Sequence, residues 1–330
     1  MKQAEVVIIG GGPAGLCAAL SAAKSGSKVL IIDKNKKLGG QLIKQTHMFF
    51  GSEKQYASKR GIDIPEILID ELYKYKENVE ISTEATVVGM YEDGIITVLE
   101  KEDNYYKIEP KAVVVATGAY EKFLGFPNND LPGIYGAGAV QTLMNVYGIK
   151  PGTRVLMVGA GNIGLIVSYQ LMQAGVEVKA ILDAAPKIGG YLVHASKIRR
   201  MGVPILTSHT VKEAIGNEFL EKAVICKVDE KFNLIEGTEI TFDVDVMCIS
   251  VGLTPLNELL AMRGCEMKYI PQLSGLVPVR NENYETTVEN VFVAGDATGV
   301  EEASAAMVEG FLAGLCAAAK IGYKPDDFME

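Results

Sequence analysis

With 330 residues, the chain is long enough to form two domains with separate hydrophobic cores. Its 22% charged and 48% hydrophobic residues are the balance of a folded globular protein, which excludes extended disorder. The net charge of −9 and the isoelectric point near 5.1 argue against partners such as nucleic acid or an anionic membrane surface.

The first predicted elements are a strand over residues 6–9, a glycine-rich turn and a helix of small residues that ends near Gly26. The turn and the helix start contain Gly10, Gly12, Pro13, Ala14 and Gly15. Glycines at the first, third and sixth places form a tight turn, admit a pyrophosphate and let the helix pack on the strand. The helix N-terminus then offers free N–H groups to the anion.

A second strand, over residues 28–32, ends in Asp33, which lies 18 residues beyond Gly15 and is followed by Lys34. A carboxylate about 20 residues past the glycines accepts hydrogen bonds from an adenosine ribose. The combination of strand, glycines, helix, strand and acid therefore predicts a dinucleotide site.

The region up to residue 118 is predicted as a mixture of elements. In order, these are a loop over 39–42, an amphipathic helix over 65–75, a strand over 85–90, turns at 92–94 and 102–104, and a strand over 112–118. Residues 43–61 combine cations with aromatic rings and are interpreted as a solvated loop, with a partner-docking surface as the alternative. The side chains concerned are Lys44, Lys54, Lys59, Arg60, Phe49, Phe50 and Tyr56.

The phosphate-binding pattern returns in mid-chain after a strand over residues 155–158. Its loop contains Gly159, Gly161, Asn162 and Gly164. The helix ends near Gly175, and the following strand ends in Asp183, which lies 19 residues beyond Gly164. Two copies imply two dinucleotides and a protein that moves electrons between them.

The second half then repeats the order of the first. A glycine pair at 189–190, a helix near 194–200, a strand at 204–206 and a meander closing on 246–252 are predicted. The turn-rich stretches 126–133 and 252–255 are candidate crossovers between domains.

The last predicted elements are a strand over residues 290–294, the pair Gly295–Asp296 and a small-residue helix over 302–320 that contains Ala303. Its positive N-terminus would favour an anion. Glycine interrupts the apolar runs throughout, so no stretch is expected to reach the roughly 18 residues of a membrane span.

The five cysteines are Cys17, Cys226, Cys248, Cys265 and Cys316. The closest two are 17 positions apart, so the chain has no Cys-x-x-Cys for zinc, an iron–sulfur cluster or a redox dithiol. Buried thiols in a reducing cytosol are expected, which predicts a cytoplasmic protein. The histidines His47, His194 and His209 lack metal-ligand spacing, so no metal site is predicted and surface or structural roles are expected.

The two glycine motifs, the strand-end acids and the terminal Gly-Asp together resemble the two-dinucleotide-binding flavoproteins of the pyridine nucleotide-disulfide oxidoreductase type. The short length is most like thioredoxin reductase. The resemblance implies an α/β fold of two Rossmann-like three-layer domains, the second inserted in the first. The FAD domain would comprise residues 1–118 and 252–330, and the NAD(P) domain residues 119–251.

The resemblance also assigns cofactor-binding residues. FAD would be held by Gly10, Gly12, Pro13, Ala14, Gly15, Asp33, Lys34, Gly40, Gln41, Leu42, Ala85, Thr117, Gly118, Gly295, Asp296 and Ala303. The nicotinamide dinucleotide would be held by Gly159, Gly161, Asn162, Gly164 and Asp183. Asp183 has no arginine in the following turn and Lys187 as its nearby cation, which favours NAD over NADP. No catalytic side chain is predicted, because hydride transfer between the cofactors needs none.

Three stretches, 39–47, 117–122 and 126–133, resemble a multi-subunit branch without the Cys pair. It includes the sarcosine oxidase α subunit, dye-linked proline dehydrogenase α subunits, and the flavin subunits of opine oxidase and hydrogen cyanide synthase. This favours a subunit of an amine or amino-acid dehydrogenase complex that partners a second flavoprotein subunit. The alternatives are a stand-alone NAD(P)H dehydrogenase that reduces ferredoxin, a quinone or a dye, and a non-catalytic cofactor-binding scaffold. The sequence does not decide whether the chain forms a homo-oligomer.

Overall fold

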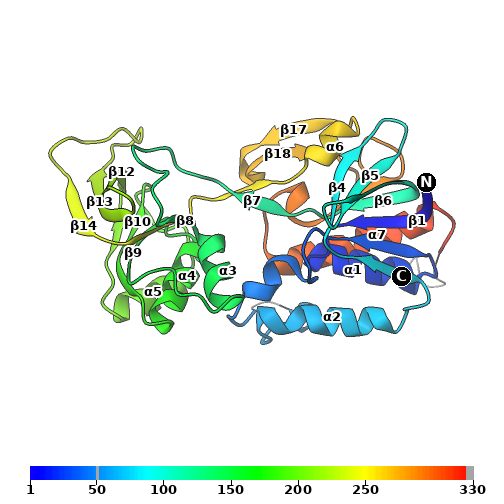
Figure 1. Ribbon diagram of the computed structural model, residues 1–330, viewed down its shortest axis with the longest axis horizontal. Helices are drawn as coiled ribbons and strands as arrows, with labels where there is room; N and C mark the ends of the chain where they lie inside the picture. The colour runs from blue at the N-terminus through cyan, green and yellow to red at the C-terminus, as the bar shows by residue number, and fades with distance from the viewer. Residues whose placement is uncertain (50–51, 325–330) are drawn as a thin grey trace. The chain divides into compact units, whose positions relative to one another are not determined.

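The computed structural model describes residues 1–49 and 52–324, so Phe50 lies outside the described residues. The chain divides into two compact units, Met1–Tyr120 with Leu253–Glu330, and Glu121–Gly252 (Figure 1). Strands β7 (Ala119–Glu121) and β16 (Leu253–Pro255) pair with each other where the chain leaves and re-enters the first unit. The second unit is therefore an insertion in the first.

The first unit is built on one seven-stranded sheet. Its strands are β1 (Lys2–Ile9), β2 (Val29–Ile32), β3 (Val79–Ser82), β4 (Ala85–Met90), β5 (Ile96–Glu100), β6 (Asn104–Val115) and β19 (Val291–Val293). The parallel part runs β3-β2-β1-β6-β19, and β5 and β4 continue antiparallel from β6. On the edge opposite β1, the long β6 pairs with two strands, since residues 104–108 pair with β5 and residues 113–115 pair with β19.

Both faces of this sheet are covered, which explains the continuous apolar run of β1. Val6 and Ile8 pack with helices α1 (Pro13–Lys24), α2 (Ile64–Tyr73) and α7 (Ala303–Lys320), which lie along one face in Figure 1. Val7 and Ile9 pack on the other face with the β4–β5 meander and helix α6 (Glu258–Met262). The remaining elements of this unit are the 3₁₀ helices η1 (Gly40–Lys44), η2 (Glu53–Gln55), η3 (Gly61–Asp63), η4 (Pro271–Leu273) and η5 (Gly295–Thr298), and the hairpin β17 (Met267–Ile270)–β18 (Gly275–Pro278).

Helices α1 and α7 pack backbone against backbone. A Cβ on Gly310 would lie 2.0 Å from the carbonyl oxygen of Ala14, and one on Gly314 would lie 2.1 Å from that of Ala18. The expectation that no segment has the length and apolarity of a membrane span is wrong for α7, which has 18 residues and a mean hydropathy of 1.3. Core helices share these properties, and the contact with α1 is that of a core helix.

The second unit has a five-stranded parallel sheet in the order β11-β10-β9-β15-β8. The strands are β8 (Ile134–Gly136), β9 (Arg154–Val158), β10 (Glu177–Asp183), β11 (Ile205–Thr207) and β15 (Val246–Ile249). Helices α3 (Ala137–Asn145), α4 (Asn162–Gln173) and α5 (Leu192–Arg200) share a core with one face. The antiparallel sheet β12 (His209–Gly216), β13 (Leu220–Lys227) and β14 (Ile240–Asp243) covers the other.

The architecture is the predicted fold class, with three local corrections. The meander of the second unit forms a separate sheet, because β15 is four residues long and has no extension like that of β6. The expected loop at 39–42 winds into η1, and the turn-rich stretch 126–133 lies inside the second unit rather than at its edge.

Candidate functional site

The glycines in the loop of the first unit are of two kinds: some are required by the backbone, and one is not. Gly10 has a φ of +103°, and a Cβ there would lie 2.3 Å from the carbonyl oxygen of Ala116. A Cβ on Gly15 would lie 1.7 Å from the carbonyl oxygen of Gly10. Gly12 differs, since its φ is −76° and the nearest atom to its Cβ position, the Cα of Gly40, is 3.8 Å away. Folding alone therefore does not require glycine at this position, whereas close approach of a phosphate does.

Asp33 supports this loop from the end of β2. The residue is 6% exposed, and its Oδ2 accepts the backbone N–H of Gly11 at 2.7 Å. Its Oδ1 accepts the backbone and side-chain N–H groups of Asn35 at 2.7 and 3.0 Å. The carboxylate is thus held at the mouth of the loop, and Lys34 beside it is exposed.

Several other predicted FAD residues gather around the same loop. Gly40 has a φ of +54°, and a Cβ on it would lie 2.8 Å from the Cα of Gly12. Ala85 is buried, and its N–H donates to the carbonyl of Asp33 at 3.0 Å. A Cβ on Gly295 would lie 2.8 Å from that of Ala14. The chain thus brings residues from five distant segments to one end of the parallel sheet.

Six further predicted residues occupy flanking positions. In η1, Gln41 is exposed and Leu42 is fully buried. The hydroxyl of Thr117 donates to the carbonyl of Leu256, and Gly118, with a φ of +79°, has no atom within 4 Å of its Cβ position. Pro13 opens α1, and Ala303 is the first residue of α7.

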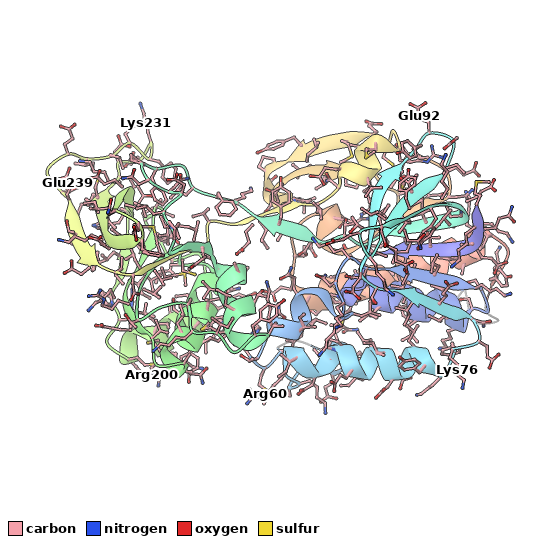
Figure 2. The ribbon with its side chains drawn as sticks, in the orientation of Figure 1. Arg60, Lys76, Glu92, Arg200, Lys231 and Glu239 are labelled. Carbon is pink, nitrogen blue, oxygen red and sulfur yellow. The ribbon has the colours of Figure 1, made fainter. Side chains whose placement is uncertain are left out.

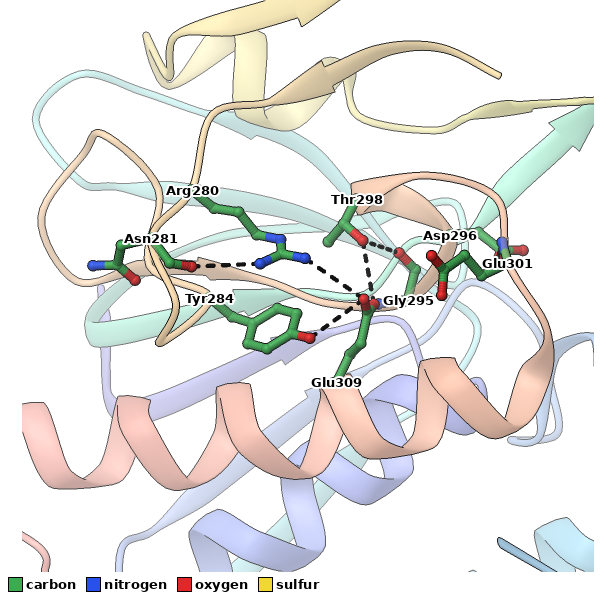
Figure 3. Close-up of polar contacts among 8 residues, drawn as sticks. All are labelled: Arg280, Asn281, Tyr284, Gly295, Asp296, Thr298, Glu301 and Glu309. Atoms are coloured by element: carbon green, nitrogen blue, oxygen red, sulfur yellow. Dashed lines mark hydrogen bonds and ion pairs between the residues drawn. The ribbon is translucent and has the colours of Figure 1, made fainter. Parts of the chain in front are cut away.

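Asp296 has a strongly perturbed carboxyl group. Burial, together with the nearby carboxylates of Glu309 and Glu301, raises its pKa from 3.8 to about 6. The backbone N–H of Glu301 donates to Asp296 Oδ1 at 3.4 Å and opposes the rise in pKa (Figure 3). A group that donates a hydrogen bond to this carboxylate would favour its charged form.

The second unit repeats the arrangement. Gly159 has a φ of +113°, and a Cβ on it would lie 2.1 Å from the carbonyl oxygen of Ser250. A Cβ on Gly164 would lie 2.0 Å from the carbonyl oxygen of Gly159, whereas nothing lies within 4 Å of the Cβ position of Gly161. As at Gly12, the space beside Gly161 is therefore not filled by neighbouring protein atoms.

The acid of the second loop is placed like that of the first. Oδ2 of Asp183 accepts the N–H of Ala160 at 3.0 Å, and its Oδ1 accepts that of Ala185 at 2.9 Å. Asn162 at the start of α4 accepts the N–H of Tyr191 at 2.8 Å, which ties the loop before α5 to the glycine turn. Lys187 is exposed.

Residues 45–49 and 58–62 lie against each other. The N–H of Gly61 donates to the carbonyl of His47, and Arg60, labelled in Figure 2, donates to the carbonyl of Thr46 at 2.9 Å. His47 is half-buried, and its ring stacks on Phe49 at 5.9 Å. The partner-docking role of this segment stays a prediction.

All five cysteines lie in the described part of the chain, and each is a free thiol. Burial raises the pKa of Cys17 to about 12 and also raises that of Cys248, so neither is poised as a thiolate nucleophile. Within residues 1–49 and 52–324, no group of three or more His, Cys, Asp or Glu side chains could hold a metal ion.

Two glycine loops, residues 10–15 (the first cradle) and 159–164 (the second cradle), each lie with a strand-end aspartate on the parallel strands of their own sheet, and they define a protein with two dinucleotide-binding folds. The chain belongs to the pyridine nucleotide-disulphide oxidoreductase family, whose model matches residues 4–310. It is therefore an FAD-dependent oxidoreductase, and the resemblance predicted from its motifs is confirmed.

Two of the similar curated proteins are subunits of oxidases. The chain is 26% identical to the alpha subunit of sarcosine oxidase from Corynebacterium sp. (strain P-1), over 97% of this chain and 33% of that protein. It is 27% identical to one subunit of opine oxidase from Agrobacterium tumefaciens (strain Ach5), over 96% of this chain and 66% of that one. The chain thus spans one third of the first relative and just under two thirds of the second.

Solved structures with the same fold include two-domain reductases and dehydrogenases. T. acidophilum thioredoxin reductase superposes with a TM-score of 0.78 at 23% identity, over 97% of this chain and 99% of that one. L-proline dehydrogenase from P. horikoshii superposes with a TM-score of 0.73 at 24% identity, over 98% of this chain and 57% of that one. These likenesses confirm the predicted fold class.

Proposed function

We propose that the first cradle holds FAD and the second holds NAD(H), and that the chain passes hydride between them as one subunit of an amine- or amino-acid-type dehydrogenase complex. The observation that carries the proposal is the room left at Gly12 and at Gly161, each beside an aspartate that braces its loop. A pyrophosphate needs this close backbone approach, and protein packing does not.

The residues fit the two cofactors in different ways. Asp33 and Ala85 would lie at the adenosine end of FAD, and Asp296 would accept from a ribityl hydroxyl. On the second cradle, Asp183 would accept from a ribose 2′-hydroxyl but would repel a 2′-phosphate, which supports NAD over NADP. With both dinucleotides bound, the two rings supply the hydride chemistry, and we assign no side-chain acid or base.

The partner is inferred from the relatives. Those from sarcosine oxidase, opine oxidase and hydrogen cyanide synthase are each named as one subunit of a larger enzyme. The chain lacks a Cys-x-x-Cys to pass electrons onward, so a second flavoprotein subunit or an electron carrier has to exchange them with the flavin. The free thiols support a place in the cytoplasm.

The test starts from the purified chain, mixed with NADH or NADPH without oxygen. A bound yellow flavin that NADH bleaches quickly, and NADPH slowly, supports the proposal. The variant Gly161→Ala should stay yellow and be bleached by dithionite but not by NADH, because its methyl group fills the second cradle alone. A colourless chain that refuses FAD on reconstitution contradicts the proposal.

Copurification after tagging the chain in its own host tests the partner. Recovery of a second flavoprotein that oxidises an amine or amino acid supports the complex. A chain recovered alone, which reduces ferredoxin, a quinone or a dye with NADH, indicates the stand-alone dehydrogenase. Flavin that NADH never reduces, in the chain alone or with its partner, indicates the scaffold.

A further inference from the structure

Glu309 is a nearly buried charged side chain that lies outside the set of predicted cofactor-binding residues. It lies in α7, and its side chain is 12% exposed. One carboxylate oxygen, Oε2, accepts the backbone N–H of Gly295 at 2.8 Å and the hydroxyl of Thr298 at 3.2 Å. The other, Oε1, accepts the hydroxyl of Tyr284 at 3.4 Å and lies 3.7 Å from Nη2 of Arg280 (Figure 3).

The two carboxylate oxygens of Glu309 thus contact different segments. The first accepts its two hydrogen bonds from η5, the turn that contains Asp296. The second contacts a separate loop, where the guanidinium of Arg280 also lies 4.0 Å from the ring centroid of Tyr284. Burial raises the pKa of Glu309, while the N–H of Gly295, the guanidinium of Arg280 and the hydroxyl of Thr298 oppose the rise. Arg280 therefore acts as the counter-charge that favours the ionised form.

The contact with Gly295 is held in place from both sides. The close packing of Gly310 on Ala14 fixes the position of α7 directly after Glu309. Gly295 has a φ of +70°, and a Cβ on it would collide with Ala14, so this peptide has little freedom. The carboxylate of Glu309 consequently fixes the Ala294–Gly295 peptide, one residue before Asp296. Charge-assisted hydrogen bonds of this kind are stronger than neutral ones.

We propose that Glu309 is a positioning residue for the flavin half of FAD: it holds the turn from which Asp296 reaches the ribityl chain, and Arg280, 3.7 Å away, is its counter-charge. The inference rests on the proposed function, because it takes the first cradle to hold FAD. It assigns Glu309 no contact with the cofactor itself.

The experiment compares FAD with ADP, titrated into the apoprotein of the full chain. ADP carries the adenosine and pyrophosphate but no ribityl chain, so it reports only on the glycine loop and Asp33. Glu309→Ala should weaken FAD binding roughly 10- to 100-fold, the effect of losing a hydrogen bond to a charged group. It should leave ADP affinity within about twofold of wild type.

Two further variants separate positioning from packing. Glu309→Gln keeps an acceptor for the N–H of Gly295 but loses the negative charge, so it should recover only part of the lost FAD affinity. Glu289→Ala removes an acid of the same unit whose side chain is 78% exposed, and it should bind both ligands like wild type. Equal losses of FAD and ADP affinity in Glu309→Ala, or no loss at all, would overturn the proposal.

A pH profile decides the matter where Glu309→Ala does not fold. The charged and titratable groups facing Glu309 are Arg280, Tyr284, Asp296 and Glu301. Arg280→Met removes the cation among them, so the pH below which FAD affinity declines should move upward relative to wild type. An unchanged profile refutes the counter-charge role and, with it, the proposal. Wild-type protein that binds ADP but never FAD refutes the proposed function itself.

Discussion

The two kinds of glycine in the first loop predict opposite outcomes for one added methyl group. In Gly12→Ala, the methyl meets its nearest atom at 3.8 Å, an ordinary contact, and the φ of −76° suits alanine. In Gly15→Ala, it would lie 1.7 Å from the carbonyl oxygen of Gly10, so the start of α1 has to move. The first change should weaken ligand binding, and the second should lower the stability of the fold.

The magnitudes follow from these distances. Replacing glycine by alanine at a compatible φ stabilises by about 0.4–1 kcal/mol, and at a helix N-cap alanine is less favourable than glycine by roughly the same amount, so the two effects nearly cancel. The free energy of unfolding of Gly12→Ala apoprotein should thus stay within about 1 kcal/mol of wild type. Overpacking against a bound pyrophosphate costs about 1–3 kcal/mol, which weakens FAD binding roughly 5- to 150-fold. Gly15→Ala should lose about 3 kcal/mol or more of stability, because the clash is with backbone.

Urea unfolding of the apoproteins and FAD titration measure the two quantities separately. Stability close to that of wild type together with weak FAD binding in Gly12→Ala supports the site. A Gly12→Ala protein that binds FAD as tightly as wild type would show that no phosphate approaches Gly12. A Gly12→Ala protein as unstable as Gly15→Ala would show that the loop needs the glycine for folding alone.

Three other substitutions test separate parts of the structure. The pKa of Asp296 is raised from 3.8 to about 6, so the apoprotein should lose stability as pH rises through this range, by on the order of 3 kcal/mol. Asp296→Asn should therefore be the more stable apoprotein at pH 8 but not near pH 4 in urea unfolding, and it should bind FAD more weakly; equal stability at pH 8 contradicts this. Asp183→Ser should raise the KM for NADH and lower that for NADPH in anaerobic flavin reduction, and an unchanged ratio would remove Asp183 from the ribose site. Gly310→Ala, whose Cβ would lie 2.0 Å from the carbonyl of Ala14, should lower the melting temperature of the first unit even without cofactor, whereas an unchanged melting temperature would mean that α7 can shift freely.

The parts of the site that sequence predicts are those that backbone geometry forces on it. Gly10 and Gly159 need a positive φ, Gly15 and Gly164 admit no Cβ, and these demands fix a readable spacing. The strand-end acids follow at a near-constant distance, because a helix and two strands take a near-constant number of residues.

The Glu309 cluster escaped prediction because its members follow no spacing rule. Arg280 and Tyr284 come from an irregular loop, and each meets Glu309 only through the tertiary fold. One signal was available, since Glu309 is the sole charged residue of α7 before its last residue, Lys320. A lone carboxylate among small apolar residues indicates a specific partner. The separate sheet of the second meander depends on strand lengths, which sequence patterns locate least well.

The assembly of the first unit from both ends of the chain has a consequence for biosynthesis. Strand β19 and helix α7 complete its sheet and its glycine cradle, yet the ribosome makes them after the whole of Glu121–Gly252. The inserted unit is one continuous stretch of chain, so all of its strands and helices are available early. Residues 10–15, in contrast, can pack against Gly310 only after that residue has been synthesised. The proposed flavin can thereby load only after α7 has been synthesised, so a nascent product truncated before α7 should carry no redox-active colour.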